Sequence, residues 1–212
     1  MSGEKLTVIL ADGVFPTGRE ALALLDRAER VICCDGAARS LVAYGREPDR
    51  IVGDLDSLTE EFKKRFADRI EQVDEQESND LSKAFRYCCQ QGYCNIVILG
   101  ATGKREDHTL GNLSLLSVYA ESVPDIKIVT DHGYFTVAKR SGVFESFAGM
   151  QVSIIALDSM VEVTSRDLKY PMDKLPLRRW YQATLNEALG TEFTLEFTVG
   201  CELLIYRTFR GK

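Results

Sequence analysis

Basic residues and long apolar runs are both scarce in this 212-residue chain. Lysine and arginine total 26 against 32 aspartates and glutamates, which leaves a net charge of −6. That balance argues against nucleic acid as a partner, because phosphate backbones bind basic surfaces. No apolar run approaches the roughly 20 residues that a membrane-spanning helix needs. We therefore expect neither a nucleic-acid partner nor a membrane segment.

The chain also lacks a secretory pattern and a C-x-x-C motif. Its first ten residues, MSGEKLTVIL, contain no long apolar core and no cleavage site, so we expect no signal peptide and a cytoplasmic location. The 6 cysteines are then expected as thiols in a reducing compartment rather than as disulfides. With only 2 histidines beside them, no ligand spacing supports a zinc site.

The first part of the chain alternates between strand and helix patterns. A helix is predicted over residues 58–70, and a later helix is marked by Leu110, Leu113 and Leu116. Such an alternation of helices with short, continuously apolar strands predicts a parallel sheet covered on both faces. The predicted strands cover residues 6–10, 31–34, 50–54, 95–100 and 126–130.

After about residue 133 the pattern becomes strand-like throughout. Several segments alternate, as in Phe193, Leu195, Phe197 and Val199, and no amphipathic helix interrupts them. This pattern favours a small antiparallel β-sandwich. We therefore predict an α/β domain over residues 1–133 and a β-sandwich domain over residues 134–212.

Charge divides at the same place. Residues 134–212 contain ten basic and nine acidic residues, whereas the preceding part contains 16 basic and 23 acidic residues. The acidic excess therefore lies entirely in the predicted α/β domain. A solvated acidic face would explain it, and so would a divalent-metal site with carboxylates at the strand ends.

Aspartates follow several of the predicted strands. Ligands of open α/β sheets bind beyond the carboxyl ends of the strands, where Asp12, Asp35 and the pair Asp54 and Asp56 are expected. Residues two apart at a strand end project to the same side, and two carboxylates so placed repel unless a cation such as Mg²⁺ lies between them. The alternative is ordinary turn chemistry, with Asp56 or Ser57 capping the next helix.

Two later segments add polar groups to the same edge of the sheet. Ser78 or Asn79 is expected to cap a helix whose first turn holds Asp80, and Gln76 lies just upstream. The loop Gly100–His108 joins a strand to a helix, so its backbone N–H groups could bind phosphate. It matches neither a Walker A loop nor a dinucleotide-binding motif. Its functional candidates are Gly103, Lys104, Arg105, Asp107 and His108, the last as an acid, a base or a brace of the loop.

Together these segments resemble the thiamin pyrophosphokinase family, in the same order along the chain. Three departures from the family pattern stand out: Asn79 replaces a threonine, Asp167 a glycine and Leu185 a serine. The matching segments are Asp35–Ala38, Gly53–Ser57, Gln76–Asp80, Gly100–His108, Leu168–Pro171 and Thr184–Glu187.

The resemblance implies transfer of the pyrophosphoryl group of ATP to the hydroxyl of thiamin, giving thiamin diphosphate and AMP. It also implies Mg²⁺, and a homodimer with sites between subunits, in which Asn186 of one chain faces the aspartates of the other. Asp54, Asp56 and Asp80 correspond to the metal positions, and either Asp80 or Asp107 could accept the hydroxyl proton. The implied ATP and phosphate contacts are Asp35, Gly36, Gln76, Gly103, Lys104, Arg105 and His108, and the implied thiamin contacts are Gln76, Tyr170, Thr184 and Asn186.

Three other functions are compatible with these motifs. The acceptor could be another alcohol, such as a pterin. A metal-dependent phosphatase could use Asp54 as its nucleophile, although such enzymes usually carry this aspartate after the first strand rather than the third. A non-catalytic nucleotide or thiamin sensor is the third possibility. Loss of a metal carboxylate would favour the sensor, but Asp54, Asp56 and Asp80 are all present.

Overall fold

A computed structural model describes residues 5–211 of the chain. It divides between Asp131 and His132 into two compact units, where the sequence predicts a boundary after residue 133. Residues 1–4, part of the segment in which we expect no signal peptide, lie outside the described residues. Among the described helices, none is both long enough and apolar enough to cross a membrane.

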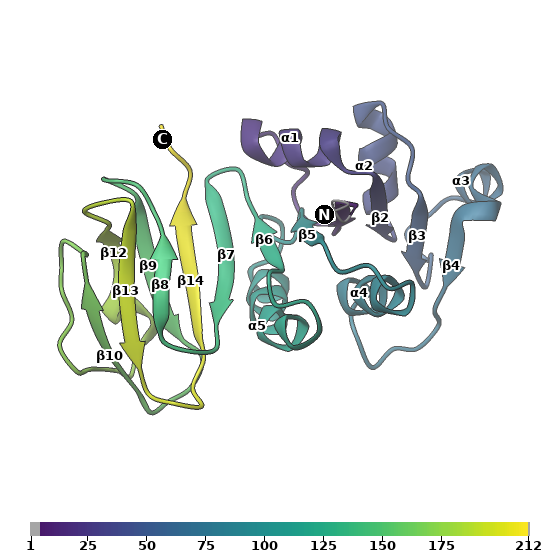
Figure 1. Ribbon diagram of the computed structural model, residues 1–212. Helices are drawn as coiled ribbons and strands as arrows, with labels where there is room; N and C mark the ends of the chain where they lie inside the picture. The colour runs from purple at the N-terminus through teal and green to yellow at the C-terminus, as the bar shows by residue number, and fades with distance from the viewer. Residues whose placement is uncertain (1–4, 212) are drawn as a thin grey trace. The chain divides into compact units, whose positions relative to one another are not determined.

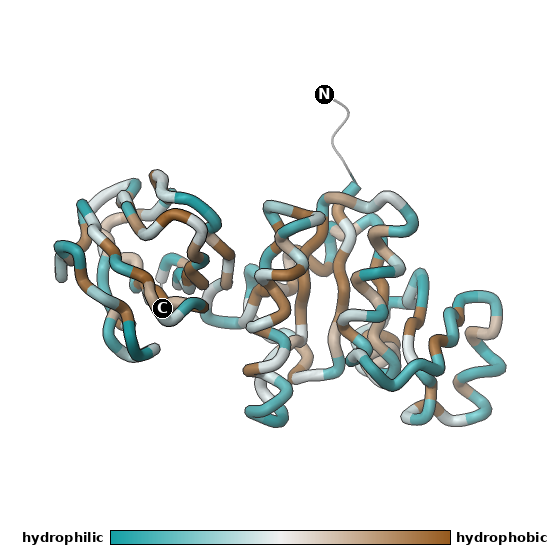
Figure 2. Tube along the Cα trace, turned by 90° about the horizontal axis from the view of Figure 1, so that it is seen from below, coloured by the Kyte–Doolittle hydropathy of each residue, from teal (hydrophilic) through white to brown (hydrophobic). Residues whose placement is uncertain are grey.

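The first unit is a parallel sheet with helices on both faces. The strands lie in the order β6-β5-β1-β2-β3-β4. They are β1 (Thr7–Leu10), β2 (Arg30–Cys34), β3 (Arg50–Gly53), β4 (Ile70–Gln72), β5 (Ile96–Leu99) and β6 (Lys127–Val129). Every residue of β1 and β5 is buried, and Figure 2 shows this continuous hydrophobicity in the strands of the sheet.

In Figure 1 the helices α1 and α2 lie on one side of this sheet, and α4 and α5 on the other. The helices are α1 (Arg19–Arg27), α2 (Ala37–Tyr44), α3 (Glu60–Arg65), α4 (Asp80–Gln90) and α5 (Glu106–Ser122). Strand order reverses between β1 and β5, because α1 and α2 lead away from β1 in one direction and α5 leads from β5 in the other. Crevices at such reversals are the usual ligand sites of this architecture.

One helix prediction for this unit needs correction, and another is confirmed. The helix predicted over residues 58–70 ends at Arg65, and the chain continues through a 3₁₀ turn (Ala67–Arg69) into β4. Buried Phe66 accepts a hydrogen bond from Arg69 N at that turn, and Ile70 then pairs with Ile51 of β3. The helix marked by Leu110, Leu113 and Leu116 is confirmed as α5, whose buried residues are Leu116, Tyr119 and Ala120, while Leu110 is exposed.

The second unit is an antiparallel β-sandwich, as predicted. One sheet has the order β12-β9-β14-β7 and the other β11-β10-β13-β8. The first consists of β7 (Gly133–Ala138), β9 (Gln151–Ala156), β12 (Ala183–Glu187) and β14 (Leu203–Thr208). The second consists of β8 (Gly142–Glu145), β10 (Val161–Arg166), β11 (Leu175–Leu177) and β13 (Glu192–Phe197).

Alternating side chains of the two sheets form the core of the sandwich. Phe193 and Leu195 of β13 belong to the same buried cluster as Val152 and Ile154 of β9. The alternation does not extend to Val199, which lies in the turn after β13 and is 99% exposed. Its inclusion in the predicted strand is wrong, because β13 ends at Phe197.

Candidate active site

An open cleft of about 460 Å³ lies at the carboxyl ends of the parallel strands. Ala11, Asp12 and Gly13, which follow β1, line it together with Ala101 and Thr102, which follow β5. The cleft therefore occupies the point at which strand order reverses. Six of the predicted site residues also line it: Asp54, Gln76, Asp80, Lys104, Arg105 and His108.

Three carboxylates converge beside the cleft. Oxygen atoms of Asp35, Asp54 and Asp56 lie within 4.8 Å of one another. Asp35 is buried, and its Oδ1 has no hydrogen-bond partner among the described residues. Burial raises the pKa of Asp35 above its ordinary value. Converging carboxylates with a buried oxygen left unpaired provide the hard oxygen donors that Mg²⁺ binds, so these residues fit that cation.

A tight turn, rather than strand alternation, places Asp54 and Asp56 together. β3 ends at Gly53, and Leu55 has a φ of 66°, in the left-handed region that a leucine seldom adopts. The Asp54 carboxylate accepts a hydrogen bond from Asp56 N at 3.3 Å, which closes the turn. The expectation that an extended backbone would direct both side chains is therefore corrected, because Leu55 interrupts it.

Gly53 allows the neighbouring carboxylates to approach. A Cβ atom at this position would lie 3.0 Å from the Cβ of Asp35 and 3.3 Å from Asp80 Oδ1. Both contacts are tighter than ordinary van der Waals packing, so a side chain here would push the two aspartates apart. Gly53 thus brings the end of β2 and the start of α4 close to Asp54.

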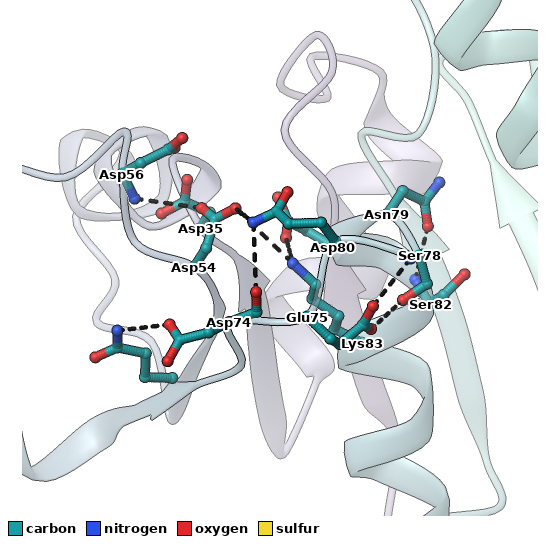
Figure 3. Close-up of polar contacts among 12 residues, drawn as sticks. Asp35, Asp54, Asp56, Asp74, Glu75, Ser78, Asn79, Asp80, Ser82 and Lys83 are labelled. Atoms are coloured by element: carbon teal, nitrogen blue, oxygen red, sulfur yellow. Dashed lines mark hydrogen bonds and ion pairs between the residues drawn. The ribbon is translucent and has the colours of Figure 1, made fainter.

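Figure 3 shows the groups that hold Asp54 and Asp80 in place. Gln76 Nε2 donates to Asp54 Oδ2 at 3.2 Å and is the main cause of a lowered Asp54 pKa. Lys83 Nζ lies 3.2 Å from Asp80 Oδ1 and 3.9 Å from Asp54 Oδ2. Burial raises the pKa of Asp80, while Lys83 opposes this shift. Sequence reasoning missed Lys83, although its place three residues after Asp80 on a helix is a detectable signal.

The start of α4 is fixed by two further side chains. Asn79 is the N-cap: its Oδ1 accepts from Ser82 N at 2.9 Å, and its Nδ2 donates to Asn112 at 3.0 Å. Glu75 accepts from the backbone N–H groups of Glu77 and Ser78 and from the Ser78 hydroxyl. These contacts organise the segment that carries Gln76. Of the two predicted caps, Asn79 is therefore the one that acts.

The loop between β5 and α5 presents exposed cations to the other side of the cleft. Lys104 Nζ lies 3.0 Å from Asp12 Oδ1, and Arg105 forms two hydrogen bonds with the carboxylate of Asp107. Arg105 lowers the pKa of Asp107, which pairs with it but does not line the cleft. The first turn of α5 contains Glu106 and Asp107, and their negative charges oppose phosphate binding by the helix itself. Phosphate binding at this helix start therefore depends on Lys104 and Arg105.

Two glycines predicted at the phosphate site lie at its margin. A Cβ on Gly36 would lie 2.8 Å from Ser57 Oγ and 2.9 Å from Asp12 Oδ2, so Gly36 allows the strand ends to pack closely. Gly103 has a φ of 93° and lines a smaller neighbouring hollow with Lys104. Neither glycine lines the main cleft itself.

In the second unit, Asn186 holds Tyr170. The Asn186 amide accepts from Tyr170 N at 3.1 Å and donates to Tyr170 O at 2.7 Å, and Asn186 is buried. Tyr170 itself is exposed, while the hydroxyl of Thr184 donates to Tyr181 O at 2.9 Å. Leu185 has a φ of 58° at a shift in register between β12 and β9, and its side chain is exposed. Three of the four predicted thiamin contacts therefore belong to this unit, Thr184 and Asn186 on β12 and Tyr170 bound to Asn186, whereas the fourth, Gln76, lines the cleft of the first unit.

Comparison with known proteins gives two consecutive family matches. The model described as thiamin pyrophosphokinase, catalytic domain, matches residues 21–130, and the model described as thiamin pyrophosphokinase, substrate-binding domain, matches residues 133–206. Thiamin pyrophosphokinase 1 of Caenorhabditis elegans is 27% identical over 206 residues, covering 87% of this chain and 84% of the relative.

Solved structures agree with these matches. The thiamin pyrophosphokinase of Geobacillus thermodenitrificans superposes with a TM-score of 0.77 at 26% identity, covering 98% of this chain and 99% of that one. The Candida albicans enzyme gives a TM-score of 0.80 at 18% identity, covering 97% and 89%, and shows the shared fold. The chain belongs to the thiamin pyrophosphokinase family, a family of diphosphotransferases.

Proposed function

We propose that this protein transfers the pyrophosphoryl group of ATP to the hydroxyl of thiamin, producing thiamin diphosphate and AMP. The observation that carries the proposal is the match of both family models, in order, to a chain whose first unit has converging carboxylates and exposed cations around one cleft. A charged triphosphate and a cation that neutralises it require such a combination.

We assign Mg²⁺ to Asp35, Asp54 and Asp56, whose oxygens converge. The bound cation would neutralise phosphate charge and align the reacting groups. The sequence prediction named Asp54, Asp56 and Asp80 as the metal ligands and Asp35 as an ATP contact. In the structure Asp80 faces the cleft from the start of α4, and its pKa is raised by burial. Asp80 is therefore better suited than Asp107 to accept the thiamin hydroxyl proton, since the pKa of Asp107 is lowered by Arg105.

Lys104 and Arg105 would bind the phosphates in place of their present partners. Both cations are exposed at the cleft and paired with single carboxylates, which an incoming triphosphate could displace. Arg105 would then stabilise charge on the transferred group as a bidentate donor. His108 and Gln76, which also line the cleft, are the remaining polar groups proposed to contact ATP.

We propose that thiamin is bound by the second unit of a partner subunit in a cytoplasmic homodimer. Tyr170 offers an exposed ring for a cationic thiazolium, and Asn186 fixes the backbone of Tyr170. Thr184 supplies a hydroxyl nearby on β12. This arrangement follows from the family resemblance, and a subunit-mixing experiment tests it.

The decisive assay supplies Mg²⁺, ATP and thiamin and measures AMP, ADP, inorganic phosphate and thiamin diphosphate. Equal amounts of AMP and thiamin diphosphate would support the proposal. ADP would indicate transfer of a single phosphoryl group, and inorganic phosphate alone a phosphatase. ATP or thiamin binding without turnover would indicate a sensor, and turnover only with a pterin alcohol a different acceptor.

A further inference from the structure

Lys83 is a buried cation in the wall of the cleft. The residue is only 3% exposed although its side chain ends in an ammonium group, and it lines the cleft together with Asp54 and Asp80. Removing an ammonium group from water is costly unless carboxylates pair with it. Here Asp80 lies 3.2 Å and Asp54 3.9 Å from Nζ, and Figure 3 shows Lys83 between them.

Lys83 joins two parts of the chain that the fold brings together. Asp54 follows β3, whereas Asp80 and Lys83 share the first turn of α4. Like charges on the two aspartates would repel, and the ammonium offsets that repulsion without any bound metal. Asp54 also belongs to the carboxylate cluster with Asp35 and Asp56, so the buried ammonium of Lys83 lies beside that cluster and pairs with Asp54 and Asp80.

We propose that Lys83 is a positioning residue that makes the site favour a divalent cation already complexed with nucleotide phosphate over the bare cation. The inference rests on the proposed function, because it assumes that a metal–ATP complex is the substrate. An ammonium close to Asp54 repels a bare Mg²⁺ ion, but it attracts the metal–nucleotide complex, whose net charge is negative. The same group thus acts in opposite directions on the two ligands.

A consequence is mutual reinforcement between metal and nucleotide. With Lys83 present, the carboxylates hold bare Mg²⁺ weakly, and phosphate oxygens add both ligands and negative charge when nucleotide enters. Each ligand then raises the affinity for the other by the same factor, as thermodynamic linkage requires. Removal of the ammonium should reduce that factor by strengthening bare-metal binding and weakening nucleotide binding.

The test measures binding rather than turnover. Calorimetric titrations determine the affinity of the full-length protein for Mg²⁺ alone, and for α,β-methylene-ATP in saturating Mg²⁺, at one pH. We expect Lys83→Met to bind bare Mg²⁺ about tenfold more tightly and the analogue about tenfold more weakly. Lys83→Arg keeps the charge and should stay within about threefold of wild type for both ligands. If Lys83→Met is not recovered folded, Lys83→Gln is titrated in its place.

The matched control is Lys63→Met. Lys63 also pairs with an acidic residue three positions earlier on a helix, at 3.1 Å from Glu60, but this pair lies on the surface of α3. The Lys63→Met substitution should therefore change neither the affinity for Mg²⁺ nor the affinity for the ATP analogue. Weaker binding of both ligands by Lys83→Met would mean that Lys83 only supports the fold and would overturn the inference, as would no change. A wild-type protein that binds neither ligand would instead refute the proposed function, and the inference with it.

Discussion

Lys83 and Arg105 both line the cleft, and each pairs with an aspartate close by in the sequence, yet their side chains are 2% and 72% exposed. Lys83 contacts two carboxylates from different elements, whereas Arg105 contacts Asp107 within its own loop. Lys83, Asp54 and Asp80 therefore form what we call the preorganised wall of the cleft. Arg105 instead belongs to a loop whose contacts are local.

This difference indicates which part of the cleft keeps its contacts when ligands bind and which part exchanges them. Exposed ion pairs contribute little to stability, so phosphate can replace Asp107 and Asp12 as partners of Arg105 and Lys104 at small cost. Removing the carboxylates that pair with Lys83 leaves its buried ammonium without a partner, which costs much more. The wall should therefore set the geometry for the metal, while the loop adapts to the phosphates.

The largest expected effect comes from removing a charge of the preorganised wall. Asp54→Asn should lower turnover by more than about a thousandfold, because the carboxylate at the centre of the cluster is lost while its shape is kept. Steady-state AMP formation measures this, and circular dichroism checks the fold. Asp68→Asn, an exposed aspartate in the 3₁₀ turn, is the control. Retention of more than a few per cent of activity would disprove the metal assignment.

Removing the cation of the adaptable loop should have a smaller effect. Arg105→Ala should lower kcat/KM by roughly 10²–10³, by analogy with loss of one preorganised donor to a developing anion. Arg65→Ala removes a comparably exposed arginine, paired with Glu47 at 3.0 Å, and should leave the rate unchanged. An unchanged rate and ATP affinity for Arg105→Ala would place that side chain outside the site.

Most of the fold follows from patterns within single segments. β1 and β5 were predictable because four successive buried apolar residues fit a strand covered on both faces. β4 was not predicted because its residues, Ile70, Glu71 and Gln72, are mostly polar, as an edge strand permits. In the second unit the strand-like pattern did not delimit β8, β11 and β12, because β8 and β11 are short and β12 contains a shift in register.

The site was predictable in composition but only partly in geometry. The strand-end aspartates were identifiable because parallel strands end at one edge of the sheet. The role of Lys83 depends on Asp54, which approaches it only when β3 and α4 pack together. Asn186 was predicted to contact substrate, but its amide is engaged by the backbone of Tyr170 across two distant segments. Such contacts depend on tertiary packing that neither segment encodes alone.

The groups proposed to bind thiamin would come from the partner subunit and complete the cleft. Mixing two inactive variants tests this proposal. The Asp54→Asn variant lacks one carboxylate of the preorganised wall. The second variant carries both Tyr170→Ala and Asn186→Ala and lacks the groups proposed to bind thiamin. A fully exchanged equal mixture should recover about a quarter of the normal sites, since about half of the dimers are mixed and each has one intact site. Activity assays and mass spectrometry measure recovery and exchange. Demonstrated exchange without recovery would place each site within one chain.

The smallest expected effect concerns the segment that supports the preorganised wall. Glu75 accepts hydrogen bonds from the Ser78 hydroxyl and from the backbone of Ser78 and Glu77, which lowers its pKa to about 2. A carboxyl whose pKa is lower in the folded than in the unfolded state stabilises the fold fully above its ordinary pKa, here 4.5. That stability is lost as the pH falls from there towards about 2.

Glu75→Gln should therefore lower the urea midpoint of unfolding slightly at pH 6. The difference between its midpoint and that of wild type should become smaller as the pH falls from 4.5 towards about 2. Glu77→Gln, on an exposed residue of the same loop, is the control and should follow wild type throughout. If the Glu75→Gln gap stayed constant with pH, its origin would be packing rather than the ionised carboxylate. The position of Gln76, and through it of Asp54, would then depend on the loop backbone alone. The difference between the preorganised wall and the exposed loop would then depend on Lys83 and Asp80.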